Sequence, residues 1–157
     1  MAQKDTAESK TVARNPKAYH DYQIGETLEV GIVLLGSEVK SLRDGKASIK
    51  EAYAAEEEGA LYLINATILE YGGANRFNHE PKRKRKLLLH KRELKRLIVA
   101  IQRKGVTLVP LSIYFNKRGI AKVSLGLATG KAQHEKRAAT KDREWKRDKA
   151  RLFKERN

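Results

Sequence analysis

The sequence predicts a mainly β domain, a small antiparallel barrel of short strands with two or three added α-helices. Apolar and polar residues alternate over 28–34, over 109–115 and over 123–127, which is the period of half-buried strands. One segment, 94–101, carries apolar side chains at the helical spacings of three and four. Short strands with few helices favour an OB-like barrel, because closing the sheet removes most exposed strand edges.

The elements follow in order along a domain expected at 15–130. Residues 1–14 are polar without apolar periodicity, and we expect a disordered leader there. After the first strand, a short helix over 37–44 is expected, which Ser37 could cap and Gly45 could end. Segments 47–55 and 60–69 flank an acidic turn at 56–59 and indicate a hairpin.

A second hairpin is predicted near the end of the domain. Gly119 can adopt positive φ in its turn, between the strand at 109–115 and the strand at 123–127. Pro110 cannot donate a ladder hydrogen bond, so the first of these strands needs an edge or a bulge there. Its alternating apolar residues predict one buried face: Val109, Leu111, Ile113 and Phe115. The helix before this hairpin is expected to stop by Gly105.

Composition limits the compartment and the partners. The 157 residues carry a net charge of +15, which attracts polyanions and points first to nucleic acid and second to an anionic membrane. No apolar run approaches the roughly 18 residues that cross a bilayer, and residues 1–14 lack the apolar centre of a signal peptide. The absence of cysteine excludes disulfides and favours a reducing compartment. We expect a soluble cytoplasmic protein.

The sequence contains no pattern typical of an active site. The histidines are dispersed, no glycine loop of the nucleotide-binding type is present, and Glu56–Glu58 is the only acidic run, at an expected hairpin tip. We therefore expect no enzyme, no cofactor and no metal. A hydrolase that uses Glu56–Glu58 or a histidine stays open as an alternative.

Basic clusters indicate structured RNA as the partner. The run Lys82–Lys86 is continuous and the basic face of the 94–101 helix follows it. Like charges this dense repel one another unless a polyanion neutralises them, although a solvated loop is the alternative. The adjacent aromatic residues of an RRM are missing, which favours recognition by shape and backbone.

The C-terminal tail, 131–157, is a second basic region. It has eleven Lys and Arg against five Asp and Glu, and its large apolar residues are few. Because these few apolar residues cannot offset the conformational entropy lost on ordering, we expect the tail to be disordered in the free protein and helical when it binds RNA. The alternative is a permanent helix packed by Trp145 and Leu152.

Stretches along the chain resemble one family. Residues 15–22, 36–43, 85–89, 130–137 and 143–151 are similar, in order and at the expected spacing, to the signature stretches of the small protein B family. The resemblance covers about residues 13–153. It implies an OB-like barrel that binds the tRNA-like domain of tmRNA and delivers it to the decoding site of ribosomes stalled on mRNA without a stop codon. It further implies that elongation factor Tu takes part indirectly through charged tmRNA, and that the tail becomes helical in the empty mRNA channel.

The same resemblance implies two sets of site residues. Glu29 and Lys122 should face outward, because each alternates with apolar neighbours. A ribosomal or ribosome-assembly protein that binds rRNA stays open as an alternative. The residues expected at tmRNA are Asn15, Lys17, His20, Glu29, Leu88, His90 and Lys122. The residues expected at the ribosome and in the mRNA channel are Gly130, Lys131, His134, Lys136, Arg137, Trp145, Lys149 and Arg151. The sequence departs from the family pattern at Pro16, His90, Thr129 and Ala132.

Overall fold

A computed structural model describes residues 10–73, 78–130, 141 and 143–152 of the chain. In chain order the elements are β1 (Lys10–Arg14), α1 (Pro16–Asp21), β2 (Tyr22–Ile32), α2 (Gly36–Arg43), β3 (Ala47–Ser48), β4 (Tyr53–Glu57), β5 (Ala60–Ile64), β6 (Thr67–Ile68), β7 (Arg85–Leu88), α3 (Lys91–Ile101), β8 (Val106–Phe115) and β9 (Ala121–Gly130). None of the helices in these ranges is long and apolar enough to span a membrane.

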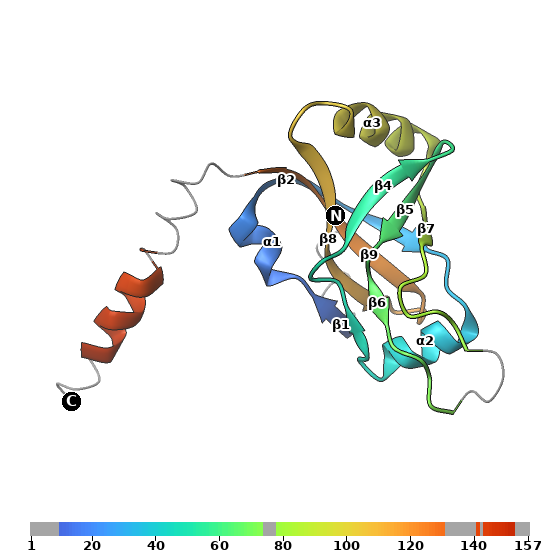
Figure 1. Ribbon diagram of the computed structural model, residues 1–157, viewed down its shortest axis with the longest axis horizontal. Helices are drawn as coiled ribbons and strands as arrows, with labels where there is room; N and C mark the ends of the chain where they lie inside the picture. Colours follow the sequence, from blue (N-terminus) through green and yellow to red (C-terminus); the bar gives the residue numbers. More distant parts are fainter. Residues whose placement is uncertain (1–9, 74–77, 131–140, 142, 153–157) are drawn as a thin grey trace.

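The strands close into an antiparallel barrel (Figure 1). The order in the sheet is β1-β8-β4-β5-β7-β2-β9, and β9 also pairs with β8, which joins the two ends of the ring. On its other edge β8 pairs with β1 near Phe115 and with β4 at Leu108. Helix α3 lies at one end of the barrel and α2 at the other. The predicted fold class, a mainly β antiparallel barrel with added helices, is confirmed.

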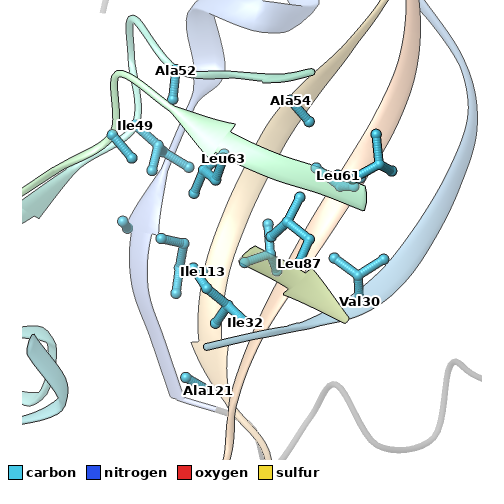
Figure 2. Close-up of a cluster of buried hydrophobic side chains, with 14 of the residues drawn as sticks. Val30, Ile32, Ile49, Ala52, Ala54, Leu61, Leu63, Leu87, Ile113 and Ala121 are labelled. Atoms are coloured by element: carbon cyan, nitrogen blue, oxygen red, sulfur yellow. The ribbon is translucent and has the colours of Figure 1, made fainter. Parts of the chain in front are cut away.

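The barrel interior is filled by inward side chains from every wall (Figure 2). Val30 of β2, Leu63 of β5 and Ile113 of β8 are each 2% exposed or less. Leu42 of α2 and Leu97 of α3 complete the core from the helices. Burying one such side chain stabilises the fold by about 1.5–3 kcal/mol.

A β-bulge at Pro110 divides β8 between two apolar clusters. The register with β9 shifts between Pro110 and Ser112, as the missing N–H of Pro110 predicts. Val109 and Leu111 consequently pack beneath α1, whereas Ile113 and Phe115 belong to the main core. The prediction of one shared buried face is therefore wrong, because a shift of one residue turns side chains to the opposite face of the sheet.

The N-terminal boundary also differs from the sequence prediction. Residues 10–14 form β1, so the expected disordered leader is wrong for them, while residues 1–9 lie outside the described residues. A strand of this length carries little periodicity of its own. The free edge of β8 supplies its ladder, and Ala13 is buried in the core as a result.

Helix α2 begins two residues earlier than a cap at Ser37 predicts. Leu35 occupies the capping position, and its backbone N–H donates to Oε1 of Glu38 at 2.8 Å. The Ser37 hydroxyl instead shares a 2.9 Å hydrogen bond with Nδ1 of the buried His79, so the prediction of a Ser37 cap is wrong. His79 comes from a loop distant in sequence, which is why local pattern could not reveal this bond.

The tail is helical at residue 141 and over 143–152. The sequence analysis expects a tail that is disordered on its own, whereas this segment forms a helix. The helix forms locally because its Lys, Arg, Glu and Ala residues have a high helix propensity. Trp145 is 66% exposed and Leu152 is 61% exposed. The described part of this helix therefore gains no stability from packing through these two side chains.

Candidate nucleic-acid interface

Four neighbouring strands present a row of outward side chains on one face of the barrel. Gly31 of β2 is paired on one side with Leu88 of β7 and on the other with Lys122 of β9. Lys122 is paired in turn with Tyr114 of β8. Because their neighbours Val30, Leu87, Val123 and Ile113 point into the core, all members of this row face outward. We call the outward side of β7, β2, β9 and β8 the outer face.

A second outward row lies beside the first. Glu29 of β2 is paired with Ser124 of β9, and Ser124 with Ser112 of β8. The hydroxyl of Tyr114 donates to Oε2 of Glu29 and thereby links the two rows. Burial and the neighbouring Glu29 carboxylate raise the pKa of Tyr114, so its phenol keeps its proton over the physiological range. The expected outward projection of Glu29 and Lys122 is confirmed.

Helix α1 covers the remaining part of the same sheet surface. Ala18 packs against Val109, Leu111 and Ala128, the cluster that the bulge of β8 creates. Lys17, which precedes Ala18 on α1, forms an exposed ion pair with Glu51 at 3.7 Å. His20 contacts Asp21 at 3.0 Å.

Asn15 differs from the other expected RNA contacts because it is buried. Only 4% of the residue is exposed, and its amide Nδ2 donates to the carbonyl of Pro110 at 3.0 Å. Its backbone N–H donates to the carbonyl of Leu111 at 2.9 Å. Asn15 thus fixes the start of α1 against the bulge, and its effect on the outer face acts through the position of Lys17 and His20.

His90 extends the outer face beyond the end of β7. It occupies the capping position of α3, where its carbonyl accepts a hydrogen bond from the backbone of Leu94 at 2.9 Å. Its side chain is exposed and lies two residues after Leu88. Of the residues expected at tmRNA, Glu29, Leu88, His90 and Lys122 therefore lie on or beside the outer face, Lys17 and His20 lie on α1, and Asn15 is buried at the start of α1.

The basic run Lys82–Lys86 is not the exposed cluster that its sequence predicts. Arg85 is fully buried and its Nε donates to Oε2 of Glu38, which is also fully buried. Arg83 donates to the other oxygen of Glu38 at 2.6 Å, and Lys84 contacts Glu57 at 2.6 Å. An internal carboxylate, and not a polyanion, neutralises the centre of the run. The prediction that the whole run binds RNA is wrong.

The buried carboxylate of Glu38 is held in its charged form. Burial raises its pKa, but hydrogen bonds from Arg83, from the backbone of Leu35 and from Arg85 outweigh that effect and set the pKa below its usual value. Arg85 also donates to the carbonyls of Ala66 at 2.9 Å and Pro81 at 3.0 Å. This network joins α2 to β7, and its role is structural.

Helix α3 keeps the exposed basic side that its sequence predicts. Its Arg96 pairs with Glu26 of β2, which raises the pKa of Arg96 and lowers that of Glu26 through their mutual hydrogen bond. Other cations on and just after the helix are exposed: Lys91, Arg92, Lys95, Arg103 and Lys104. The exposed positive charge of the domain therefore lies on α3 and on Lys82, Lys84 and Lys86 of the run, while Arg85 is buried.

The family model described as "SmpB protein" matches residues 12–155 of the chain. The chain belongs to the SmpB family. An SsrA-binding protein of Azorhizobium caulinodans is 55% identical over 158 residues, which is 99% of each chain. One from Chelativorans sp. is 58% identical over 146 residues, covering 93% of this chain and 94% of the relative. A solved structure described as "tmRNA-SmpB: a journey to the center of the bacterial ribosome" matches with a TM-score of 0.66 and 52% identity, over 81% of this chain and 92% of that one.

The residues expected at the ribosome are only partly described. Gly130 ends β9 and is exposed, while Trp145, Lys149 and Arg151 lie on the exposed tail helix. Trp145 and Lys149 are four residues apart and share one helical face. The remaining expected residues lie outside the described ranges: Lys131, His134, Lys136 and Arg137.

The acidic run has no arrangement typical of catalysis. Glu56 and Glu57 lie beside the turn between β4 and β5, where Glu56 accepts a hydrogen bond from the backbone of Gly59. Within residues 10–73, 78–130, 141 and 143–152, no group of three or more His, Asp or Glu could hold a metal ion. This part of the chain gives the hydrolase alternative no metal centre.

Sequence reasoning missed two members of this SmpB outer face, Gly31 and Tyr114. Both are identified by cross-strand pairing, which places them between Leu88 and Lys122 or beside Glu29. No local signal separates Tyr114 from any other outward strand residue. The pairing of β8 with β9 and of β9 with β2 had to be known first.

Proposed function

We propose that this chain binds the tRNA-like domain of tmRNA through its outer face and α1. It then delivers tmRNA to the decoding site of ribosomes stalled on mRNA without a stop codon. The protein acts as an RNA-binding partner and not as an enzyme, works in the cytoplasm, and meets elongation factor Tu indirectly through charged tmRNA.

The observation that carries this proposal is the gathering of the expected tmRNA contacts. Glu29 comes from β2, Leu88 from β7 and Lys122 from β9, yet the three lie outward on neighbouring strands, and α1, which carries Lys17 and His20, packs on the same sheet through Ala18. Residues up to a hundred positions apart meet there because the barrel closes β9 onto β2. The names of the relatives and of the matched structure support tmRNA as the RNA.

We propose that the tail acts separately, in the empty mRNA channel of the ribosome. Two features support this division. The described part of the tail helix is exposed on all sides, with Trp145 at 66%, and it carries the exposed cations Arg147, Lys149 and Arg151, whose charge suits phosphates. Among the described residues, the apolar side chains of the barrel core all come from positions before the tail, which supports a domain that folds without it.

A binding competition tests the first part. The full chain should retain a labelled tRNA-like domain of tmRNA against an excess of rRNA fragments of equal length at physiological salt. Ala at His20 should weaken this binding by about fivefold, the loss of one hydrogen bond or phosphate contact, without lowering the melting temperature. Preference for rRNA fragments would favour the alternative, a ribosomal or ribosome-assembly protein, and would overturn the proposal.

A further inference from the structure

The outward side of α3 carries an exposed apolar side chain among cations. Val99 is 58% exposed in the second half of the helix. Leu97 is 1% exposed and packs into the barrel core, so Val99 lies on the opposite side, about 200° further round the helix. Helix α3 lies at one end of the barrel, and no described element covers this side of it (Figure 1). Val99 therefore serves neither the barrel core nor the outer face.

An open groove of about 430 Å³ lies beside Val99, between α3 and the last part of β9. Its floor comes from Ala100 and Leu127, which are both partly buried. Apart from the charged ends of three cations, the groove presents aliphatic carbon. A partner that places an apolar side chain there removes apolar surface from water on both molecules, which favours binding. The residues that line the groove are Lys95, Arg96, Val99, Ala100, Arg103 and Leu127.

Two of the cations at the groove are unpaired within the part of the chain that the structure describes. Arg96 pairs with Glu26 of β2, whereas Lys95 and Arg103 take part in no ion pair there. They lie four residues before and four residues after Val99, which puts each about 6 Å along the helix axis from Val99 on the same side. The complementary partner carries one apolar side chain with an acidic side chain one helical turn away on each side.

The charge of the groove selects among possible occupants. The tail, 131–157, has eleven Lys and Arg against five Asp and Glu, and a second copy of the chain carries the same net charge of +15. The unpaired cations repel both. A nucleic acid matches the cations, but its phosphates leave Val99 and Leu127 facing water. An acidic protein segment with an apolar side chain matches the charge and the apolar floor together.

We propose that this groove docks an acidic amphipathic helix of a partner protein. The apolar side chain of that helix lies against Val99 and Leu127, and its carboxylates pair with Lys95 and Arg103. A helix bound in a groove is recognised through side chains one turn apart, which is the spacing of these three positions on α3. The groove lies at the α3 end of the barrel, so the outer face stays open to RNA. The inference does not rest on the proposed function.

Peptide selection on the full chain tests this proposal. Phage display random peptides of about 16 residues, long enough for roughly four helical turns. One arm uses the free chain and the other uses the chain saturated with the tRNA-like domain of tmRNA, both at physiological salt. We expect the same peptides in both arms, with an apolar residue and Asp or Glu three or four positions before and after it. Fluorescence anisotropy then gives the dissociation constant of a synthetic copy of the selected peptide.

Substitutions assign the bound peptide to the groove. Val99→Glu should weaken its binding by about tenfold or more, because one apolar contact is lost and a carboxylate meets the acidic peptide. The matched control is Val33→Glu, at a valine that is 43% exposed beyond the end of β2, and it should leave the affinity unchanged. Lys95→Glu and Arg103→Glu should each weaken binding by up to about fivefold. All these variants should keep the wild-type melting temperature, since the side chains are exposed.

A charge swap provides the decisive control. A peptide with Lys in place of its acidic residues should bind the double variant Lys95→Glu/Arg103→Glu better than it binds wild type. No enriched peptide, enriched peptides without acidic residues, binding that survives Val99→Glu, or a charge swap without effect would overturn the proposal. Displacement of the peptide by the tRNA-like domain would assign the groove to RNA and overturn it as well. Failure of the chain to bind the tRNA-like domain would overturn only the proposed function, because the arm with the free chain uses no RNA.

Discussion

Replacing Arg85 by Met should unfold the protein more easily and leave RNA binding of the folded protein unchanged. Arg85 is fully buried, pairs with the fully buried Glu38 and donates to two backbone carbonyls. Removing one partner of a buried ion pair costs about 3–5 kcal/mol when the other charge is left uncompensated. Because Arg83 still pairs with Glu38 after the change, the loss should lie at the lower end, about 3 kcal/mol. With a urea slope of about 2 kcal/mol/M, the unfolding midpoint should fall by roughly 1.5 M.

The matched control is Lys82→Met, in the same basic run. Lys82 is exposed and has no ion pair within the described residues, so the free energy of unfolding of this variant should stay within about 0.5 kcal/mol of wild type. The assay is urea unfolding followed by circular dichroism, with tRNA-like domain binding measured on the folded variants. An Arg85→Met protein of wild-type stability with weak RNA binding would refute the buried-pair reasoning and restore the run as an RNA site.

The stability of the protein in acid should depend on the same Glu38–Arg85 pair. Because the pKa of folded Glu38 lies below its usual value of 4.5, its contribution to stability is complete above that pH. The contribution is lost as the pH falls through the lowered folded pKa, where the carboxylate takes up a proton. Wild type should therefore lose stability more steeply below pH 4.5 than the double variant Glu38→Met/Arg85→Met, in which the pair is absent. Parallel acid profiles would contradict this assignment.

Three further results are expected. Truncation after Gly130 should keep the melting temperature and most of the affinity for the tRNA-like domain, since the described core ends within β9. The same truncation should abolish peptide tagging on stalled ribosomes, and normal tagging by the truncated protein would refute a separate tail function. The logarithm of RNA affinity should fall linearly and steeply with the logarithm of salt concentration, because several phosphates are neutralised, and a flat response in filter binding would exclude the basic face of α3 and Lys122 as contacts. Amide hydrogens of residues 143–152 should exchange rapidly in the free protein, because the described helix is exposed throughout, and should become protected only on ribosomes carrying a truncated message.

Local pattern predicted the elements with strong periodicity and missed those without it. The strands around Leu28 and Val123, the helix around Leu97 and the bulge at Pro110 all follow from spacing or from the missing proline N–H. Strand β1 and helix α1 are short, so their residues carry too little periodicity to be recognised. Their formation depends on the edge of β8 and on the apolar cluster beneath α1, which exist only after the barrel closes.

The candidate site divides in the same way. The sequence alone determined the excess of positive charge, the absence of cysteine, the strand and helix periods and the family resemblance, from which Glu29, Leu88 and Lys122 are expected at the site, because these are properties of residues and their spacing. It could not determine which charges in Lys82–Lys86 are buried, because Glu38 lies 47 residues from Arg85 and meets it only through the packing of α2 against β7. Nor could it place Tyr114 beside Glu29, 85 residues apart. Charge and period are local, whereas pairing and burial depend on which distant segments the closed barrel brings into contact.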